Sequence, residues 1–371
     1  MTEARTGSRT AVVLAVGKFG PEIGGPYQTV SSYARVLSEC GVKAQVLAMP
    51  SSGTSGGGCE RNCRRLPHRG LRLWWSLAGE VWKLRDAPVV IFGVWHPVFF
   101  AFGLGRRLMP RRFASGRRVL SPTQSLTPWD WAKHRWLKRV LRPLVVRILH
   151  SFDLVIFATQ GEMQSSTPAI VDARSAVVYH PIAPMKAHPA DAAAKRIVSV
   201  GRIVEQKDIR LFLETIAGLP PDWSADVVGS GTDRYVCELM EVARDLGCED
   251  RVRWHGWLSR DETHEVVVGA GALVVTSWAE NYSHASVEAM MLGVPVVMVS
   301  RVAAAVDLAR FDLGVVTPPT PEALVQAVLR VDADSKLRAR LLQNARAFAV
   351  DRMGSADGPR LAELVVGGVA S

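Results

Sequence analysis

Residues 277–297 read SWAENYSHASVEAMMLGVPVV. They follow an apolar run at 272–276. A polar loop leads to a stretch with helical spacing from His284 to Leu292, and a second apolar run occupies 294–299. Gly293 stands where a helix of this kind ends. Strand, loop, helix and strand in this order predict one crossover unit of a parallel sheet. Because such sheets bind ligands beyond the carboxyl ends of their strands, a binding site is expected at this loop.

Strand and helix patterns alternate in the same way along the rest of the chain. The expected strands are 11–16, 42–48, 88–93, 118–121, 154–159, 197–200, 225–228, 252–255, 272–276 and 294–299. A chain of 371 residues exceeds what one hydrophobic core usually serves, and a Pro- and Ala-rich stretch at 181–194 is the expected linker. The predicted domains are residues 1–185 and 186–371, with the last helix packing back on the first domain. The predicted fold is therefore α/β, with two doubly wound Rossmann-like domains facing across a cleft.

Charge is divided unevenly between the two halves. Residues 1–188 contain 26 Lys and Arg against 10 Asp and Glu, and the remaining residues contain 19 against 25. The net charges of +16 and −6 add up to the +10 of the whole chain. A basic first half predicts an anionic partner for the first domain.

Cysteine usage and hydropathy point to a cytoplasmic protein. The cysteines are Cys40, Cys59, Cys63, Cys237 and Cys248, an odd number without framework spacing, which favours a reducing compartment. Cys59 and Cys63 with His68 lack an evident fourth ligand, so no metal site is expected. No segment reaches the roughly 18 uninterrupted apolar residues of a membrane span, and no signal peptide is recognised.

Two loops contain residues suited to phosphate. Gly24-Gly25-Pro26 lies between a strand and a helix, where free N–H groups favour an anion, although such a turn is more often only a turn. Gly201 and Arg202 follow a strand, with Lys207 five residues beyond Arg202. Two cations at this edge can bracket a diphosphate, or they can be solvated surface charges.

Two carboxylates flank the helix start in the opening stretch. Glu280 falls in the loop and Glu288 lies within the following helix. Both can accept hydrogen bonds from hydroxyls, one set from a sugar and one from a ribose, while the helix N–H groups between them meet phosphate. The alternative is that Glu280 is only a favourable negative charge at the helix N-terminus and that Glu288 is a solvated side chain. Glu288 sits among apolar residues, however, and is expected to need a polar partner.

These residues together resemble the retaining GT-B glycosyltransferases of family four. The resemblance rests first on the E-x7-E segment at 280–288, followed by Ala-Met and Gly-Val-Pro-Val-Val. Further matching stretches are Gly24-Gly25-Pro26, Val200-Gly201-Arg202 with Lys207, Val228-Gly229-Ser230-Gly231, Trp254-His255-Gly256, and the region from Ser121-Pro122 to the basic helix at Lys133. The likeness spans nearly the whole chain, and the C-terminal motifs are specific.

The resemblance implies a role for each matching residue. Arg202 and Lys207 would neutralise the donor diphosphate, Glu288 would hold the ribose, and Glu280 would hold the transferred sugar. Glu280, Arg202 and Lys207 are thus the predicted catalytic residues. The remaining predicted donor-binding residues are Gly24, Gly25, Gly201, Asn281, Tyr282, Ser283 and His284. The resemblance also implies retention at the anomeric carbon, no metal, and no cofactor besides the nucleoside-diphosphate sugar, which is a substrate.

The N-terminal half departs from the family pattern at a residue that often touches the donor sugar. Many relatives have His-Gly where this chain has Thr123-Gln124, and His-Gly-Leu-Trp at 92–95, where it has Phe-Gly-Val-Trp. His96 and Gln124 are the candidates to replace the missing histidine or to meet the acceptor. His180-Pro181 stands where relatives often have Asn and is interpreted as structural.

The basic half contains a helix that suits a membrane surface. Residues 133–150 mix six Lys and Arg with Trp136 and several aliphatic residues, in an amphipathic helix that Pro143 is expected to break. Trp74, Trp75 and Trp82 lie near further basic residues. The alternative is an ordinary crossover helix with its apolar face in the core. No nucleic-acid motif accompanies the charge.

The sequence therefore predicts a retaining hexosyltransferase. It would move a hexose or aminohexose from a nucleoside-diphosphate sugar to the hydroxyl of a small-molecule or lipid-linked saccharide acceptor bound by the first domain. Two alternatives are a nucleotide-sugar epimerase, for which no convincing acid and base pair is found, and a non-catalytic sugar-nucleotide-binding protein. The predicted location is the cytoplasm, with peripheral contact at the inner face of the membrane.

Overall fold

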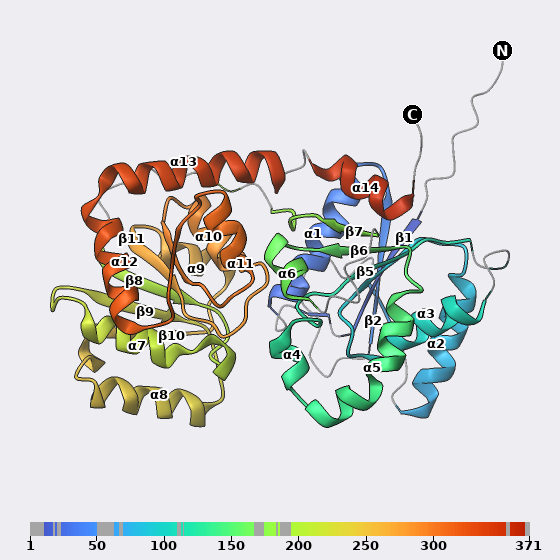
Figure 1. Ribbon diagram of the computed structural model, residues 1–371, viewed down its shortest axis with the longest axis horizontal. Coiled ribbons are helices and arrows are strands. Elements are labelled where there is room, and N and C mark those ends of the chain that lie inside the picture. Colours follow the sequence, from blue (N-terminus) through green and yellow to red (C-terminus); the bar gives the residue numbers. More distant parts are fainter. Residues whose placement is uncertain are drawn as a thin grey trace, which may run out of the picture. The chain divides into compact units, whose positions relative to one another are not determined.

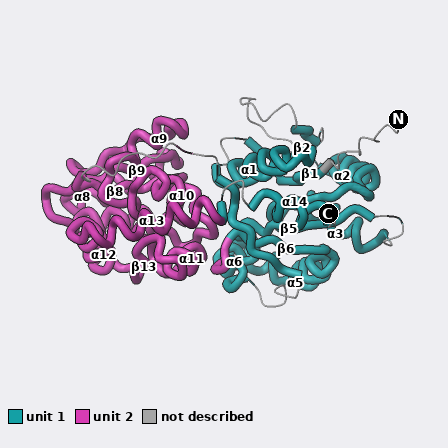
Figure 2. Tube along the Cα trace, turned by 90° about the horizontal axis from the view of Figure 1, so that it is seen from above, with its two compact units in different colours: residues 1–158, 162–183, 352–371 teal, residues 159–161, 184–351 magenta. Residues whose placement is uncertain are grey.

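The computed structural model forms two compact units (Figures 1 and 2). Unit 1 contains residues 1–158, 162–183 and 352–371, and unit 2 contains residues 159–161 and 184–351. The structure describes residues 11–17, 19–20, 24–49, 63–66, 70–109, 113, 115–166, 174–182, 185, 194–353 and 357–367. Within these residues, no helix has the length and apolar character needed to cross a membrane.

Unit 1 is built on a parallel sheet with the strand order β3-β2-β1-β4-β5-β6-β7. Its strands are β1 Ala11–Val16, β2 Lys43–Ala48, β3 Cys63–Arg65, β4 Val89–Phe92, β5 Arg118–Ser121, β6 Leu154–Phe157 and β7 Ser175–Val177. Its helices are α1 Gly25–Glu39, α2 Leu71–Lys83, α3 Pro97–Leu108, α4 Pro128–Ala132, α5 Arg135–Leu149, α6 Gln160–Ser165, whose first two residues belong to unit 2, and α14 Gly358–Val366. The central strands are apolar on both faces, as a sheet covered by helices on both sides requires.

Helices cover the two faces of this sheet in separate layers. Buried residues of α2, α3 and α5 share one core cluster, and those of α1 and α14 share the other. Two glycines of α3 let its neighbours approach closely: a Cβ on Gly103 would lie 2.2 Å from Ile148 of α5, and a Cβ on Gly105 would lie 2.3 Å from Val81 of α2. Helices α2, α3 and α5 therefore form one tightly packed layer (Figure 1).

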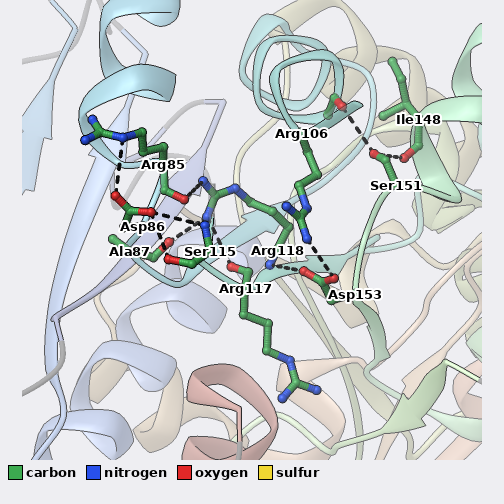
Figure 3. Close-up of polar contacts among 11 residues, drawn as sticks. Arg85, Asp86, Ala87, Arg106, Ser115, Arg117, Arg118, Ile148, Ser151 and Asp153 are labelled. Carbon is green, nitrogen blue, oxygen red and sulfur yellow. Dashed lines mark hydrogen bonds and ion pairs between the residues drawn. The ribbon is translucent and has the colours of Figure 1, made fainter. Parts of the chain in front are cut away.

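A buried arginine connects elements at the amino-terminal edge of the unit 1 sheet (Figure 3). The Arg118 guanidinium donates to the carbonyls of Leu84 and Ala87, just beyond the end of α2, and Asp153 accepts from the Arg118 backbone N–H and from Arg106. Burial lowers the pKa of Arg118 to about 10, and the charge of Arg106 acts in the same direction. The guanidinium satisfies carbonyls that the end of α2 leaves without helical partners, which assigns Arg118 a role in the fold.

Unit 2 contains a second parallel sheet with the order β10-β9-β8-β11-β12-β13. Its strands are β8 Ala194–Val200, β9 Ser224–Val228, β10 Val252–Gly256, β11 Ala270–Val275, β12 Val296–Val299 and β13 Val315–Thr317. Its helices are α7 Ile209–Gly218, α8 Asp233–Asp245, α9 Arg260–Val267, α10 His284–Met291, α11 Ala304–Arg310, α12 Pro321–Ala333 and α13 Ser335–Arg352. In each sheet the strand order reverses beside its first strand, as in doubly wound folds, so the predicted fold class is confirmed.

The structure corrects one local prediction and adds three strands. Pro143 does not break its helix: α5 runs from Arg135 to Leu149 through it. Proline leaves the carbonyl four residues earlier, at Arg139, without a helical donor, and both residues are exposed, so water can satisfy it. Strands β3, β7 and β13 were not predicted from the sequence. Each has three residues and lies at the edge of its sheet.

Candidate functional site

The predicted donor residues of unit 2 gather where the strand order of its sheet reverses. Strands β8 and β11 are neighbours at this point, and their connections leave in opposite directions along the sheet. Gly201 to Lys207 follow β8, and Ser277 to Glu288 follow β11. The carboxyl edge at such a reversal leaves a crevice in which doubly wound sheets bind their ligands.

Hydrogen bonds hold these two loops together. The Trp278 backbone N–H donates to the Gln206 carbonyl over 2.8 Å, and the Gln206 side chain donates to the Ala279 carbonyl over 2.9 Å. The Thr276 hydroxyl donates to the Lys207 carbonyl over 3.0 Å. The chain on either side of Lys207 and Glu280 is thereby fixed before any ligand binds.

Glycines allow the neighbouring loops to approach each other closely. A Cβ on Gly229 would lie 1.8 Å from the Gly201 carbonyl oxygen, and a Cβ on Gly231 would lie 2.4 Å from that of Ile203. Gly201 and Gly229 also have φ values of 144° and 140°, which other residues adopt only with strain. The Gly-Ser-Gly motif after β9 is therefore explained by close packing on the loop after β8.

Lys207 and Glu280 form an ion pair across the two loops. Lys207 Nζ lies 2.5 Å from Glu280 Oε2, and both side chains are mostly buried. Glu280 Oε2 also accepts a hydrogen bond of 3.4 Å from Ser277. Arg202 is exposed, and the described part of the chain gives its side chain no hydrogen bond or ion pair. An ammonium has three donors, so Lys207 can hold Glu280 and still contact an anionic ligand.

Helix α9 supplies both partners of Glu288. Arg260 Nε lies 3.0 Å from Glu288 Oε1, and His264 Nε2 lies 3.4 Å from Oε2. Burial acts to raise the pKa of Glu288, but the hydrogen bond from His264 and the charge of Arg260 outweigh it and hold the pKa below its ordinary value. Glu288 is therefore an ionised hydrogen-bond acceptor at neutral pH, with the polar partners that its apolar surroundings require.

His284 lies in the electrostatic reach of both carboxylates. Burial lowers the pKa of His284 to about 4, and Glu288 and Glu280 oppose this shift without cancelling it. The ring therefore stays neutral at physiological pH and packs 4.9 Å from the ring of Tyr282. Neutral imidazole offers one donor and one acceptor, which suits sugar hydroxyls better than it suits phosphate.

The backbone before α10 takes a left-handed turn that aims the helix start. Ser283 has φ of 56° and bonds through its hydroxyl to Ser286 over 2.6 Å. Tyr282 is buried, and the Asn281 carbonyl accepts a hydrogen bond of 2.8 Å from Thr159, which belongs to the same unit. The N-terminal end of α10 is the positive end of the helix dipole and can attract an anion.

Arg301 is a site residue that the sequence analysis missed. It follows β12 and donates to the carbonyls of Thr276 and Ser277 and to the carboxylate of Asp208, with distances of 2.5 Å, 3.0 Å and 2.5 Å. Its guanidinium lies 3.7 Å from the centre of the Trp278 ring. Arg260, His264 and Asp208 were missed as well, because no motif marks residues that act only through their neighbours.

The remaining predicted residues belong to unit 1, and Gly24, Gly25 and His96 lie at the reversal of its strand order. Gly24 has φ of 71° and caps α1 after β1, with Gly25 as the first helical residue. His96 caps α3 after β4: its Nδ1 accepts from the Phe99 N–H over 3.4 Å, and its Nε2 lies 2.7 Å from the Phe92 carbonyl. Both ring nitrogens are thus used within the unit, and burial lowers the pKa of His96 to about 4.

Gln124 lies in a strained turn after β5. Thr123 and Gln124 have φ values of 48° and 73°, a conformation that costs energy for residues with side chains. The buried Glu162 carboxylate holds the turn, accepting from the backbone N–H groups of Gln124 and Ala158 over 2.6 Å and 2.8 Å. Backbone strain maintained by a buried carboxylate is a feature of functional loops, so Gln124 remains a candidate for contact with acceptor or sugar.

Within the described residues, no three His, Cys, Asp or Glu side chains are placed to hold a metal ion. Cys59 and His68 lie outside the described residues. The unit 2 arrangement instead offers cations, carboxylates and a helix N-terminus at one edge of the sheet. These groups suit a ligand that carries both a diphosphate and hydroxyl groups.

Solved structures that match this fold include glycosyltransferases of lipopolysaccharide biosynthesis. An Anabaena protein, HepE, solved with UDP and also with UDP-glucose, superposes with a TM-score of 0.75 in its UDP complex. That match covers 95% of this chain and 99% of HepE at 18% identity. The chain therefore has the fold of the GT-B glycosyltransferases.

Sequence comparison places the similarity mainly in unit 2. Residues 184–348 match the family model described as glycosyl transferases group 1. The lipopolysaccharide core biosynthesis glycosyltransferase LpsE of Rhizobium meliloti is 30% identical over 156 residues, and the 2-deoxystreptamine glucosyltransferase of Streptomyces kanamyceticus is 24% identical over 237 residues. The alignments cover 42% and 59% of this chain, and 44% and 57% of these relatives. The match to glycosyl transferases group 1 is thus carried by residues 184–348, and the chain spans about half the length of these curated relatives.

Proposed function

We propose that this chain is a retaining glycosyltransferase that moves a hexose or aminohexose from a nucleoside-diphosphate sugar to an acceptor hydroxyl. The observation that carries the proposal is the placement of Lys207, Glu280 and Glu288 at the strand-order reversal of unit 2, within the region that matches the glycosyltransferase family model. A UDP-sugar is the first donor to test, because HepE is solved with UDP-glucose.

Each group has a distinct part in this reaction. Arg202 and Lys207 stabilise the negative charge that develops on the diphosphate as the bond to the anomeric carbon breaks, which lets the reaction proceed without a metal ion. Glu288, ionised and held by α9, accepts hydrogen bonds from the ribose. Glu280 accepts from the sugar hydroxyls, and the neutral His284 contacts the same sugar.

Unit 1 is proposed to hold the acceptor, with Gln124 in its strained turn as the first candidate contact. The relatives include enzymes named for a lipopolysaccharide core and for 2-deoxystreptamine. We therefore retain two classes of acceptor, a lipid-linked saccharide and a small molecule. We place the enzyme in the cytoplasm, as its sequence predicts.

Thermal stabilisation by UDP-, GDP-, ADP- and dTDP-sugars, with a chelator present, tests the proposal. One nucleotide should raise the melting temperature, because a ligand at about 100 times its Kd stabilises the folded state by about 2.7 kcal/mol. NMR of the product anomeric proton then reports retention or inversion. Stabilisation without transfer or donor hydrolysis would favour the non-catalytic protein, and interconversion of two donor sugars would favour the epimerase.

A further inference from the structure

Exposed aromatic and aliphatic side chains are concentrated on one layer of unit 1. Trp74, Trp75 and Trp82 of α2 have exposed fractions of 44%, 81% and 58%. Trp136 and Val140 of α5 have exposed fractions of 75% and 69%. These helices flank α3 in the layer that packs on one face of the sheet (Figure 1).

The exposed residues of α2 follow one helical stripe. Leu71, Trp75 and Trp82 are spaced i, i+4 and i+11, which places them on one side of the helix. Leu73, Leu77 and further core residues of α2 occupy the opposite side. Helix α2 therefore has an apolar stripe on its outward side as well as on its inward side. Core packing requires only the inward stripe.

Helix α5 also has an exposed stripe on its outward side, with basic residues in it and beside it. Trp136, Val140, Pro143 and Arg147 have the same i, i+4, i+7 and i+11 spacing and are all exposed. The side of α5 next to this stripe carries the exposed residues Arg135, Arg139 and Arg142. Its core side consists of Val145, Ile148 and Leu149, together with Lys138, which is buried and paired with Asp130.

No carboxylate is exposed on the three helices of this layer. Within Leu71–Lys83, Pro97–Leu108 and Arg135–Leu149 the one acidic residue is Glu80, which is buried and paired with Arg64 and Lys83. The Arg85 guanidinium lies 4.8 Å from the ring centre of Trp82, so cation and aromatic ring present one amphipathic surface. Arg85 is also paired over 3.4 Å with Asp86, an exposed carboxylate just beyond α2. The three helices themselves expose no carboxylate, and their basic surface is complementary to a negatively charged partner.

From these observations we propose that the outer face of α2 and α5 binds the surface of an anionic lipid bilayer. Tryptophan prefers the headgroup region, where its ring is apolar and its N–H meets water. Arginine buries its stem at the same depth and keeps its charge at the phosphates. The starts of both helices lie at the carboxyl edge of the unit 1 sheet, so Trp74, Trp75 and Trp136 would anchor the edge at which Gln124 and His96 also lie.

Binding of the full-length protein to vesicles, measured by flotation, tests this surface. Vesicles of phosphatidylcholine alone are compared with vesicles that also contain phosphatidylglycerol. The first variant combines Trp75→Ser, Trp82→Ser and Trp136→Ser, all at exposed positions. Its matched control is Trp257→Ser in unit 2, where the side chain is 67% exposed.

A second variant tests the charge. Arg135→Gln, Arg139→Gln and Arg142→Gln are combined, and the control combines Arg234→Gln, Arg330→Gln and Arg346→Gln, three exposed arginines of unit 2. Each lost charge should weaken binding roughly fivefold at low salt, giving on the order of 100-fold for three. Circular dichroism and melting temperature confirm that each variant is folded.

The proposal predicts binding to anionic vesicles only, at least a tenfold loss for the tryptophan variant, and little change for either control. Absence of binding by the folded wild type would overturn it, which is also the result expected if the face binds another protein. Equal binding by the tryptophan variant and Trp257→Ser would overturn insertion of the aromatic residues. Because the assay contains no donor, it can fail while glycosyl transfer is intact, and the reverse also holds.

Discussion

At the scale of single residues, the proposed donor site contains charged groups that already have partners. Lys207 is paired with Glu280, and Glu288 is paired with Arg260 and His264. Such pairs keep the side chains in one geometry before the ligand arrives, which reduces the entropy lost on binding. The prediction for each residue is therefore a loss of ligand affinity rather than a loss of fold.

Glu288→Gln should weaken donor binding by roughly 10- to 100-fold, because a hydrogen bond to a charged acceptor contributes about 1.5–3 kcal/mol. The amide has nearly the same shape as the carboxylate but only one acceptor oxygen. Isothermal titration with the nucleoside diphosphate measures the change. Glu265→Gln on the exposed side of α9 is the control, and equal affinity in both variants would remove Glu288 from the site.

Lys207→Gln should lower donor affinity by about tenfold at low salt, with a smaller difference at high salt, where mobile ions screen the attraction to the diphosphate. The matched control is Lys195→Gln, a lysine in the same unit that pairs with Asp222 in an exposed position. Titrations at two ionic strengths separate the interpretations. A loss of equal size at both would mean that Lys207 acts only by holding Glu280.

At the scale of secondary-structure elements, the sequence predicted those strands and helices whose positions are controlled by the local sequence pattern. The central strands were predictable because their apolar runs are buried on both faces, and the E-x7-E motif located the loop and helix around Glu280 and Glu288. Strands β3, β7 and β13 were not predictable, because three residues at a sheet edge are held by the neighbouring strand rather than by their own preference. Arg301 was missed for the same reason, since its partners come from other loops.

Arg301 connects three loops, so Arg301→Lys should alter turnover more than stability. Lysine keeps the charge but loses the planar fork that reaches Asp208 and two carbonyls at once. We expect kcat/KM to fall roughly 10-fold or more, as misplacement of the Glu280 loop raises the barrier. Steady-state kinetics and melting temperatures are compared with Arg310→Lys on α11. A lower melting temperature with unchanged kcat/KM would indicate a purely structural role.

His96, the N-cap residue of α3, should make the stability of unit 1 sensitive to acid. The pKa of His96 is about 4 in the folded protein against an ordinary value of 6.5, so between these values the unfolded chain binds a proton that the folded chain excludes. Stability is thus unaffected above pH 6.5, falls as the pH drops towards 4, and falls no further below it. His96→Asn keeps a good capping residue but does not titrate.

Thermal unfolding of His96→Asn at pH 7.5 and 4.5 checks this linkage. The variant should be less stable than wild type at pH 7.5, because it loses the bond to the Phe92 carbonyl. At pH 4.5 the difference should shrink or reverse, by up to about 2 kcal/mol. His134→Asn is the control, because His134 is exposed and has a left-handed backbone that Asn tolerates. A difference that is the same at both pH values would show that His96 does not control the acid response.

At the scale of the whole molecule, the two units differ in charge and in chemistry. The first half of the sequence is basic and its α2 and α5 expose tryptophan and arginine, whereas the second half has a net negative charge and carries most of the predicted donor residues. A membrane surface and a nucleotide sugar would therefore act on different units. This division predicts that each ligand changes hydrogen exchange in a different unit.

Hydrogen exchange measured with and without the nucleoside diphosphate should reveal the segments that the nucleotide affects. We expect slower exchange at residues 201–207 and 277–288, because ligand contacts tie down the loops after β8 and β11. Exchange in α2 and α5 should change with anionic vesicles and not with the nucleotide. Slower exchange at the start of α1 with the nucleotide would add Gly24 and Gly25 to the donor site, as the sequence predicts. Protection by the nucleotide in α2 and α5, with none after β8 and β11, would contradict the assignment of the donor to unit 2.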